Sequence, residues 1–352
     1  TESGFVTIGG ILPLTQSESW DFALPVKRVA EYAISQVNKN GGINGKKLRI
    51  VWRDGGCDPK IAAEVAQDLI FNEKVKVIFG GACSAETAAI APLAQQNKVI
   101  LMSSVSSHSS ISFMGDYVFR TIPSFVMEGK LLARYALQKG YKKIAILSEE
   151  TQFPLHVATD FEKSFVEEGG EELILQTYDY HYKMDYDVMI AEMLTGNADA
   201  YFINPPHADG MIELFEALEK SPLKKPLLFN DLLLESPKAI REHAAFLEGA
   251  IGIKLYTDMT HPDFKKLKLD YYKRYRKPLP YPEFTGRTYD AMMLLAEALR
   301  ASSTDTAVMR DYLYGIKNRK AVSGILSFDE NGDAGPGYRL YEIRKGRMLV
   351  ID

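Results

Sequence analysis

Three short segments carry side chains that could hold a small polar ligand. Ser84 follows a Gly-Gly-Ala-Cys run and begins a pattern of helical spacing, so its hydroxyl and nearby amides could bind an anion. Ser106 and Ser107 lie in a Ser-rich segment, residues 103–110, which offers both hydrogen-bond donors and acceptors. Asp231 follows the run KPLLFN, at the end of a predicted strand, where a carboxylate could bind an ammonium group. Together these residue types could bind both poles of an amino acid.

Each of these residues also has an ordinary structural explanation. Ser84 is a suitable N-cap for the helix that follows it. The Ser-rich segment could form polar turns through its hydroxyls. Asp231 could cap the next helix rather than bind a ligand.

The elements that must position these residues alternate between strands and helices. In the first half, strands separated by helices of ten or more residues predict right-handed βαβ units and a parallel sheet. Ligands bind beyond the carboxyl ends of such strands, which is where Ser84 and the Ser-rich segment lie. We predict strands at 6–12, 46–54, 75–81 and 99–106, and helices at 25–42, 58–73 and 84–97.

A second series of comparable size follows the first. The two α/β series predict two similar lobes with several crossings between them. A strand at 248–257, a helix at 288–302 and a C-terminal hairpin complete the chain. The second series has predicted strands at 117–124, 142–150, 171–180, 198–206 and 225–231, and helices at 125–140, 153–170, 185–197 and 211–221.

The two cysteines, Cys57 and Cys83, each follow a predicted strand. If the two strands are neighbours in the sheet, their loops meet and the thiols could pair; the alternative is two buried, reduced thiols. A disulfide closing this loop would add about 3 kcal/mol to stability and would indicate an oxidising compartment. Two cysteines at this spacing form no zinc signature, and we expect neither a metal nor a cofactor.

Length and composition indicate a protein of about two domains and give no sign of nucleic-acid binding or of a membrane span. A chain of 352 residues with 46% hydrophobic content can form about two domains with sizeable cores. The net charge is -4, and no basic block indicates nucleic-acid binding. No apolar run is long enough to span a bilayer. The first residue is Thr1, as expected for a processed chain without its leader or for a shortened one.

Several segments resemble the periplasmic leucine/isoleucine/valine-binding proteins of ABC transporters. They are NKNGGINGKKLRIVWRDGGCDPKIAAEVAQDLI, VIFGGACSAET, VILMSSVSS, DYDVMIAEM and FTGRTYDAMMLLAEAL. The resemblance implies an α/β type I periplasmic binding protein fold, with two Rossmann-like lobes joined by three hinge crossings and a ligand cleft between them. Lobe 1 would comprise residues 1–121 and 251–328, and lobe 2 residues 122–250 and 329–352.

The resemblance also implies roles for single residues. The cysteines would form a disulfide, because Cys57 and Cys83 match the positions of the family's bridge. A serine after the second cysteine, here Ser84, would bind the ligand carboxylate. Ser106 and Ser107 would add backbone groups and a hydroxyl to the same site.

The other pole of the ligand would be held by the second lobe. Asp231 would bind the ammonium group, and Trp20 or Phe22 would line the pocket for the ligand side chain. This chain departs from the family at two ligand-binding positions: Phe153 stands where a tyrosine is usual, and His207 lies where an aromatic residue is frequent. These changes alter the second-lobe half of the pocket.

The function implied is an extracytoplasmic solute-binding protein of an ABC uptake transporter. It would capture a small amino acid, branched-chain or otherwise apolar, by cleft closure. Its partners would be this small molecule and a membrane permease, and it would act as a monomer that binds no nucleic acid. The location would be the periplasm, or the cell exterior with a lipid anchor in a Gram-positive organism.

Three alternatives remain open. The same fold could bind an aromatic or other small carboxylate, or an amide. It could also serve as the ligand-binding ectodomain of a sensor. An enzyme is disfavoured, because Ser107, His207 and Asp231 could form a triad only by chance and no Gly-x-Ser-x-Gly elbow is present.

Overall fold

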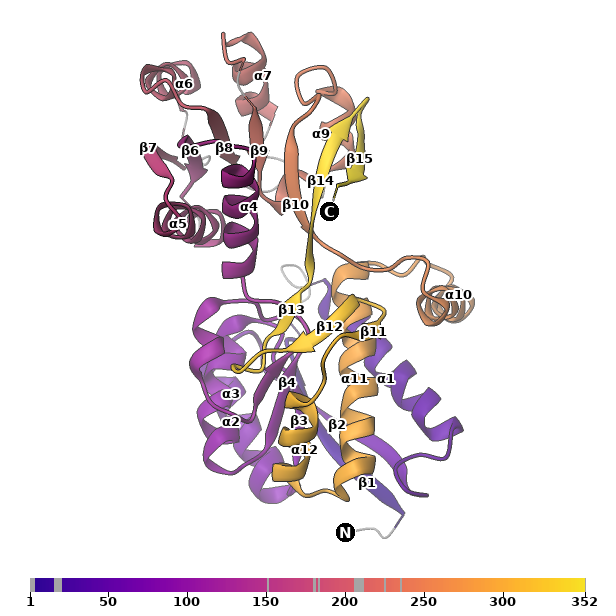
Figure 1. Cartoon of the computed structure of the whole chain (residues 1–352). Coiled ribbons are helices and arrows are strands. Elements are labelled where there is room, and N and C mark those ends of the chain that lie inside the picture. The colour runs from indigo at the N-terminus through magenta and orange to yellow at the C-terminus, as the bar shows by residue number, and fades with distance from the viewer. Residues whose placement is uncertain are drawn as a thin grey trace. The chain divides into compact units, whose positions relative to one another are not determined.

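The computed structural model divides the chain into two compact units (Figure 1). Unit 1 comprises Thr1–Ser124 and Tyr256–Gly337, and unit 2 comprises Phe125–Leu255 and Tyr338–Asp352, so the chain crosses between them three times. The structure describes residues 4–15, 21–150, 152–179, 182, 184–205, 212–224, 226–234 and 236–351.

Unit 1 is built on a parallel five-stranded sheet with the order β2-β1-β3-β4-β5. The sheet is parallel because each strand returns through a helix, as the alternating pattern predicts. Its strands are β1 (Phe5–Leu12), β2 (Lys47–Asp54), β3 (Val77–Gly80), β4 (Ile100–Ser103) and β5 (Val118–Arg120).

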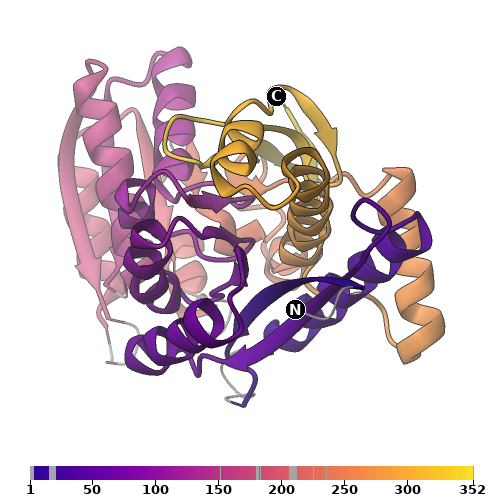
Figure 2. The ribbon, with the colours of Figure 1, turned by 90° about the horizontal axis from the view of Figure 1, so that it is seen from below.

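Helices cover both faces of this sheet, and alternate residues of each strand face opposite ways. In β3, Val77 and Phe79 pack in the core formed with α1 and α11, whereas Ile78 faces α2 and α3. Helices α1 and α11 also pack against each other, and Figure 2 shows α11 nearly along its axis. These helices are α1 (Ala23–Lys39), α2 (Pro59–Gln67), α3 (Ser84–Gln96) and α11 (Pro282–Ser302).

Unit 2 contains a seven-stranded sheet with the order β15-β14-β10-β9-β8-β6-β7. The strands from β7 to β10 are parallel, and β14 and β15 add an antiparallel edge. The strands are β6 (Lys143–Glu149), β7 (Glu171–Tyr178), β8 (Ala200–Asn204), β9 (Leu227–Phe229), β10 (Ile251–Leu255), β14 (Tyr338–Arg344) and β15 (Arg347–Val350).

Both faces of this second sheet are buried as well. In β8, Phe202 packs in the core with α4 and α5, while Tyr201 and Ile203 pack in the core with α6 and α7. The two Rossmann-like lobes predicted from the sequence are therefore present. The helices are α4 (Val126–Gln138), α5 (Gln152–Glu167), α6 (Tyr186–Thr195) and α7 (Ile212–Lys220).

All three unit boundaries lie later in the chain than the predicted lobe boundaries, after Ser124, Leu255 and Gly337 rather than after residues 121, 250 and 328. Strand β10 lies in unit 2 rather than lobe 1, because it pairs with β9 and β14. The stretch after residue 328 remains in unit 1 up to Gly337, because β13 (Ala334–Pro336) pairs with β12 (Gly324–Phe328). Strand pairing sets these two boundaries, and pairing partners are not visible in the sequence pattern.

Several elements have no counterpart in the sequence analysis. Helix α10 was detectable, because Phe264, Leu267 and Tyr271 form a buried stripe at helical spacing. Helix α12 buries Met309 and Leu313 one turn apart, and the remaining elements are too short to show a period. The additional elements are α8 (Asp231–Leu234), α9 (Pro237–Glu242), α10 (Pro262–Tyr275), α12 (Thr306–Tyr314), β11 (Arg319–Ala321) and a 3₁₀ helix at Ser109–Phe113. Within the described ranges, no helix is long and apolar enough to cross a membrane.

Candidate ligand-binding site

A disulfide joins Cys57 to Cys83 beyond the carboxyl ends of two strands of unit 1. Their Cα atoms lie 5.5 Å apart, within the usual range for a disulfide. The pairing implied by the resemblance is therefore present. The strands that precede the cysteines are not neighbours, however, because β1 lies between β2 and β3 and pairs with both.

The Glu86 carboxylate joins the same two loops. Its Oε1 accepts a hydrogen bond from the Cys57 amide at 3.0 Å, and its Oε2 accepts bonds from the amides of Ala82 at 2.9 Å and Cys83 at 3.2 Å. Burial raises the pKa of Glu86, although the three amides act in the opposite direction. The sequence analysis missed Glu86, whose signal is its place at the third position of the helix, where capping boxes carry Glu.

Ser84 is the first residue of α3, at the end of the loop that Glu86 and the disulfide fix. Its hydroxyl oxygen accepts a hydrogen bond from the His108 amide at 3.3 Å. This contact brings the loop after β3 and the Ser-rich segment after β4 together. Ser107 is buried beside them, and no hydrogen bond joins its hydroxyl to another described residue.

Ser106 differs from its neighbour because its polar groups are used within unit 1. Its hydroxyl donates to the Gly81 carbonyl at 2.9 Å and lies 2.7 Å from Thr87 Oγ1. Its amide donates to Ser103 Oγ at 3.1 Å. The Ser106 hydroxyl therefore holds the Ser-rich segment against the Gly81 turn, and its ligand-binding role stays a prediction.

Of the two aromatic candidates, Phe22 belongs to an aromatic cluster at the start of α1. Its ring centroid lies 5.4 Å from that of Phe284 and 6.4 Å from that of Tyr281. This cluster packs the start of α1 against the beginning of α11. Trp20 lies outside the described residues.

In unit 2, Asp231 lies two residues beyond the end of β9 and begins the short helix α8. Its side chain is buried, and its amide donates to Glu128 Oε1 at 3.0 Å. Glu128 lies in the first turn of α4, and Glu149 ends β6. Over the described part of unit 2, the buried charged residues are all acidic: Glu128, Glu149 and Asp231. Such a setting favours a cationic group over an anionic one.

Two other second-lobe candidates cannot be assigned contacts. Phe153 falls in the first turn of α5, and its side chain lies outside the described part of the structure, as does His207 as a whole. The residues at neighbouring strand ends are polar. Asn204 ends β8 and donates to Ser148 Oγ at 2.9 Å, and Asn230 follows β9 and donates to the Pro205 carbonyl at 3.0 Å.

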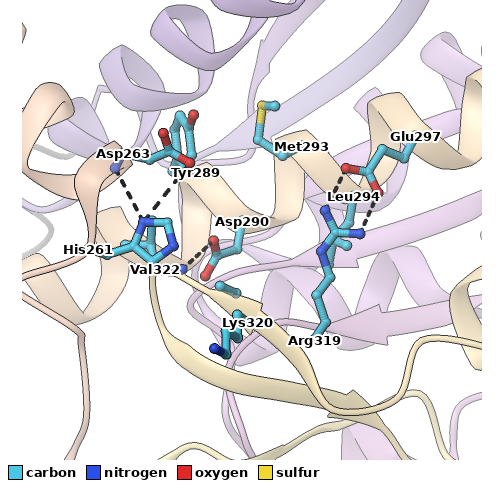
Figure 3. Close-up of a pocket in the computed structure, with 11 residues that line it drawn as sticks. His261, Asp263, Tyr289, Asp290, Met293, Leu294, Glu297, Arg319, Lys320 and Val322 are labelled. Carbon is cyan, nitrogen blue, oxygen red and sulfur yellow. Dashed lines mark hydrogen bonds and ion pairs between the residues drawn. The ribbon is translucent and has the colours of Figure 1, made fainter.

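A cavity of about 80 Å³ lies elsewhere in unit 1, between α10, α11 and β11 (Figure 3). Three of its charged side chains already have partners. Asp290 accepts bonds from the amides of Val322 at 3.0 Å and Ser323 at 2.7 Å, while Arg319 and Glu297 form two contacts of 2.6 Å. Burial raises the pKa of Asp290. The cavity is smaller than ligand pockets of about 300–1,000 Å³, and its charged residues fix the turn before β12.

Comparison with known proteins places similar sequences in one family. A model of the periplasmic binding protein family matches residues 6–347. The Leu/Ile/Val-binding protein homolog 1 of Brucella abortus is 25% identical over 348 residues, covering 97% of this chain and 91% of the relative.

Two solved structures share the fold. One is an ABC transporter substrate-binding protein from Desulfitobacterium hafniense in complex with Leu, with a TM-score of 0.75, 22% identity and coverage of 99% of this chain and 100% of that chain. The other is a solute-binding protein of an ABC transporter from R. palustris in complex with 4-hydroxybenzoate, with a TM-score of 0.74, 21% identity and coverage of 99% and 96%.

These similarities extend over both units. The matched region begins in β1 and ends in β15, so it includes every strand of the two large sheets at least in part. The type I periplasmic binding fold predicted from the sequence is confirmed by the solved structures. The family consists of binding proteins and not of enzymes. The chain belongs to the periplasmic binding protein family.

Proposed function

We propose that this chain is the extracytoplasmic solute-binding protein of an ABC uptake transporter and that it captures a small apolar amino acid by cleft closure. The observation that carries this proposal is the difference between the strand ends of the two units. In unit 1, the Ser84 hydroxyl lies at the start of a helix and the buried Glu86 carboxylate near it is already bonded to three amides, whereas the buried charged residues described in unit 2 are all acidic. An amino acid has one pole suited to each.

Unit 1 offers the anion side of this arrangement. Helix α3 has 13 residues and begins at Ser84, so its first amides and its dipole favour a carboxylate there. The Ser107 hydroxyl is available beside it. We assign the ligand carboxylate to Ser84 and Ser107, while Ser106 shapes the loop.

Unit 2 offers the cation side. Asp231 is buried and lies just beyond the end of β9, where a carboxylate can bind an ammonium group. We assign the ligand ammonium to Asp231. The aromatic residues Phe22, Trp20 and Phe153, with His207, remain the candidates for contacts to the ligand side chain.

A second candidate ligand is an aromatic carboxylate. The solved relative from R. palustris binds 4-hydroxybenzoate, and this chain has Phe153 and His207 where the leucine-binding family usually has other residues. An aromatic acid would use Ser84 and Ser107 in the same way. It would make no use of Asp231, because it has no ammonium group.

The proposed location and partners follow from this role. A disulfide between Cys57 and Cys83 is typical of an oxidising, extracytoplasmic compartment such as the periplasm. The partner would be a membrane permease that recognises the ligand-bound monomer. The Brucella abortus relative and the substrate-binding protein from Desulfitobacterium hafniense support a transporter of this type.

The test is a thermal-shift panel of L-leucine, L-isoleucine, L-valine, 4-hydroxybenzoate, benzoate and a simple amide. A ligand at about 100 times its Kd should add about 2.7 kcal/mol to the free energy of unfolding. Stabilisation by the L-amino acids, lost in Ser107→Ala but kept in Ser110→Ala, is the expected result. Ser110 is an exposed serine of the same segment, bonded to His108. Stabilisation by aromatic acids alone would replace the amino-acid assignment with the second candidate.

A further inference from the structure

A buried guanidinium lies directly behind the Ser-rich segment. Arg120 ends β5 and has a fully buried side chain. One of its nitrogens, Nη1, donates to two backbone carbonyls of that segment, that of His108 at 2.8 Å and that of Ser106 at 3.3 Å. These carbonyls flank Ser107, so Arg120 fixes the backbone on both sides of the proposed ligand-binding hydroxyl.

The other nitrogens of Arg120 bind Asp333. Nε donates to Asp333 Oδ1 and Nη2 to Oδ2, both at 2.6 Å, which is the bidentate geometry that matches a guanidinium to a carboxylate. Ser112, two residues beyond the Ser-rich segment, donates to Asp333 Oδ2 at 2.6 Å and accepts from Arg120 Nη2 at 2.8 Å. The ion pair therefore holds the Ser-rich segment at the carbonyls of Ser106 and His108 and holds the chain just after it at Ser112.

Asp333 is itself held by a tight turn. The Asp329 carboxylate accepts hydrogen bonds from the amides of Asn331 and Asp333, each at 2.9 Å, and the Asp329 amide donates to the Asp333 carbonyl. The chain continues from this turn through β13 to Gly337, where unit 1 ends. Arg120 likewise lies shortly before Ser124, the other end of a unit 1 segment. The pair thus links the Ser-rich segment to two of the three places where the chain crosses to unit 2.

We propose that Arg120 is a positioning residue for ligand binding: paired with Asp333, it holds the carbonyls of Ser106 and His108 so that Ser107 faces the ligand. This inference rests on the proposed function of the Ser-rich segment. Lysine keeps the positive charge but has no planar fork, so it cannot bind Asp333 at two points and both carbonyls at once. The Ser-rich segment then loses its fixed backbone.

The test compares Arg120→Lys and the milder Ser112→Ala with Arg319→Lys. Arg319 forms the other bidentate ion pair described above, with Glu297 in the same unit, and does not touch the Ser-rich segment. Affinity for L-leucine is measured by calorimetry at a temperature where all the proteins are fully folded. We expect Kd to rise at least ten-fold in Arg120→Lys and by about three-fold in Ser112→Ala, and to stay within two-fold of the parent in Arg319→Lys.

A second readout does not require a ligand. In spectra of the ¹⁵N-labelled, ligand-free protein, the amide signals of Ser107 and His108 should shift or broaden in the Arg120 and Ser112 variants and not in Arg319→Lys. If the parent does not bind L-leucine, the ligand assignment is wrong, and these spectra alone test whether Arg120 positions the Ser-rich segment. If Arg120→Lys does not fold, the Ser112→Ala variant provides the same test. Unchanged signals together with unchanged Kd values, at reduced thermal stability, would overturn the inference and leave Arg120 a purely structural residue.

Discussion

The Cys57 amide donates a hydrogen bond of 3.0 Å to the buried carboxylate of Glu86, across the same two loops that the Cys57–Cys83 disulfide joins. The loop that carries Ser84 is therefore fixed twice, once by a covalent bond and once by a carboxylate with three amide donors. This arrangement makes Glu86 important for the stability of the site, although we assign it no contact with the ligand.

Replacement of Glu86 by Gln should destabilise the protein. The amide nitrogen of Gln is a donor, so at least one of the backbone amides of Cys57, Ala82 and Cys83 would lose its acceptor. Leaving a buried donor unsatisfied costs about 1–3 kcal/mol. Urea denaturation should show this loss at neutral pH, and an unchanged midpoint would contradict the structural role of Glu86.

The same carboxyl group predicts a pH dependence. Burial raises the pKa of Glu86 in the folded protein, so the folded state binds more protons than the unfolded state between the two pKa values. Its contribution to stability is largest below the unfolded-state pKa and falls as the pH rises through the folded-state pKa. The free-energy difference between parent and Glu86→Gln should therefore decrease from acid to neutral pH. A difference that grows over this range would contradict the raised pKa.

Ser106 and Ser107 should respond differently to truncation. Ser106→Ala removes buried hydrogen bonds to Gly81 and Thr87 and should cost about 1–3 kcal/mol of stability. Ser107→Ala removes no hydrogen bond within the described structure, so it should leave stability nearly unchanged and weaken ligand binding. Thermal unfolding and calorimetric titration of both variants would separate the two roles. Equal loss of affinity without loss of stability in both would contradict the structural role of Ser106.

Asp231 should contribute through its charge rather than as a helix cap. Asp231→Ala should weaken binding of an amino acid by about 2–5 kcal/mol, because the ligand ammonium would lose its buried partner. Asp185→Ala is the matched control, since Asp185 caps α6 in the same unit by accepting a bond from the Val188 amide. That variant should lose about 1 kcal/mol of stability and no affinity. If Asp231→Ala also loses about 1 kcal/mol of stability and no affinity, Asp231 acts only as a helix cap.

Much of the fold was predictable because hydrophobic periodicity is local. The strand of residues 6–12 and the helix of residues 84–97 appear as β1 and α3 within two residues at either end. Sheet order was not predictable in the same way. The insertion of β1 between β2 and β3 depends on long-range pairing, as does the place of β10 in unit 2.

For the candidate site, the sequence could predict only which polar residues lie in loops that follow strands. Ser84 and Ser107 could be found from their types and positions. The pattern could not show that the Ser106 hydroxyl turns inward to Gly81, because neighbouring residues of an irregular loop have no fixed periodicity. Arg120 and Asp333 were missed for a different reason: they are far apart in sequence, and only the folded chain brings them together.

The most direct test of the amino-acid assignment is a pair of calorimetric titrations, with L-leucine and with 4-methylpentanoate, which is the same acid without its amine. The proposed site has one region for the carboxylate and a buried acid for the ammonium group, so L-leucine should bind at least ten-fold more tightly. Equal or tighter binding of 4-methylpentanoate would contradict the role of Asp231 and the assignment of an amino acid as the ligand.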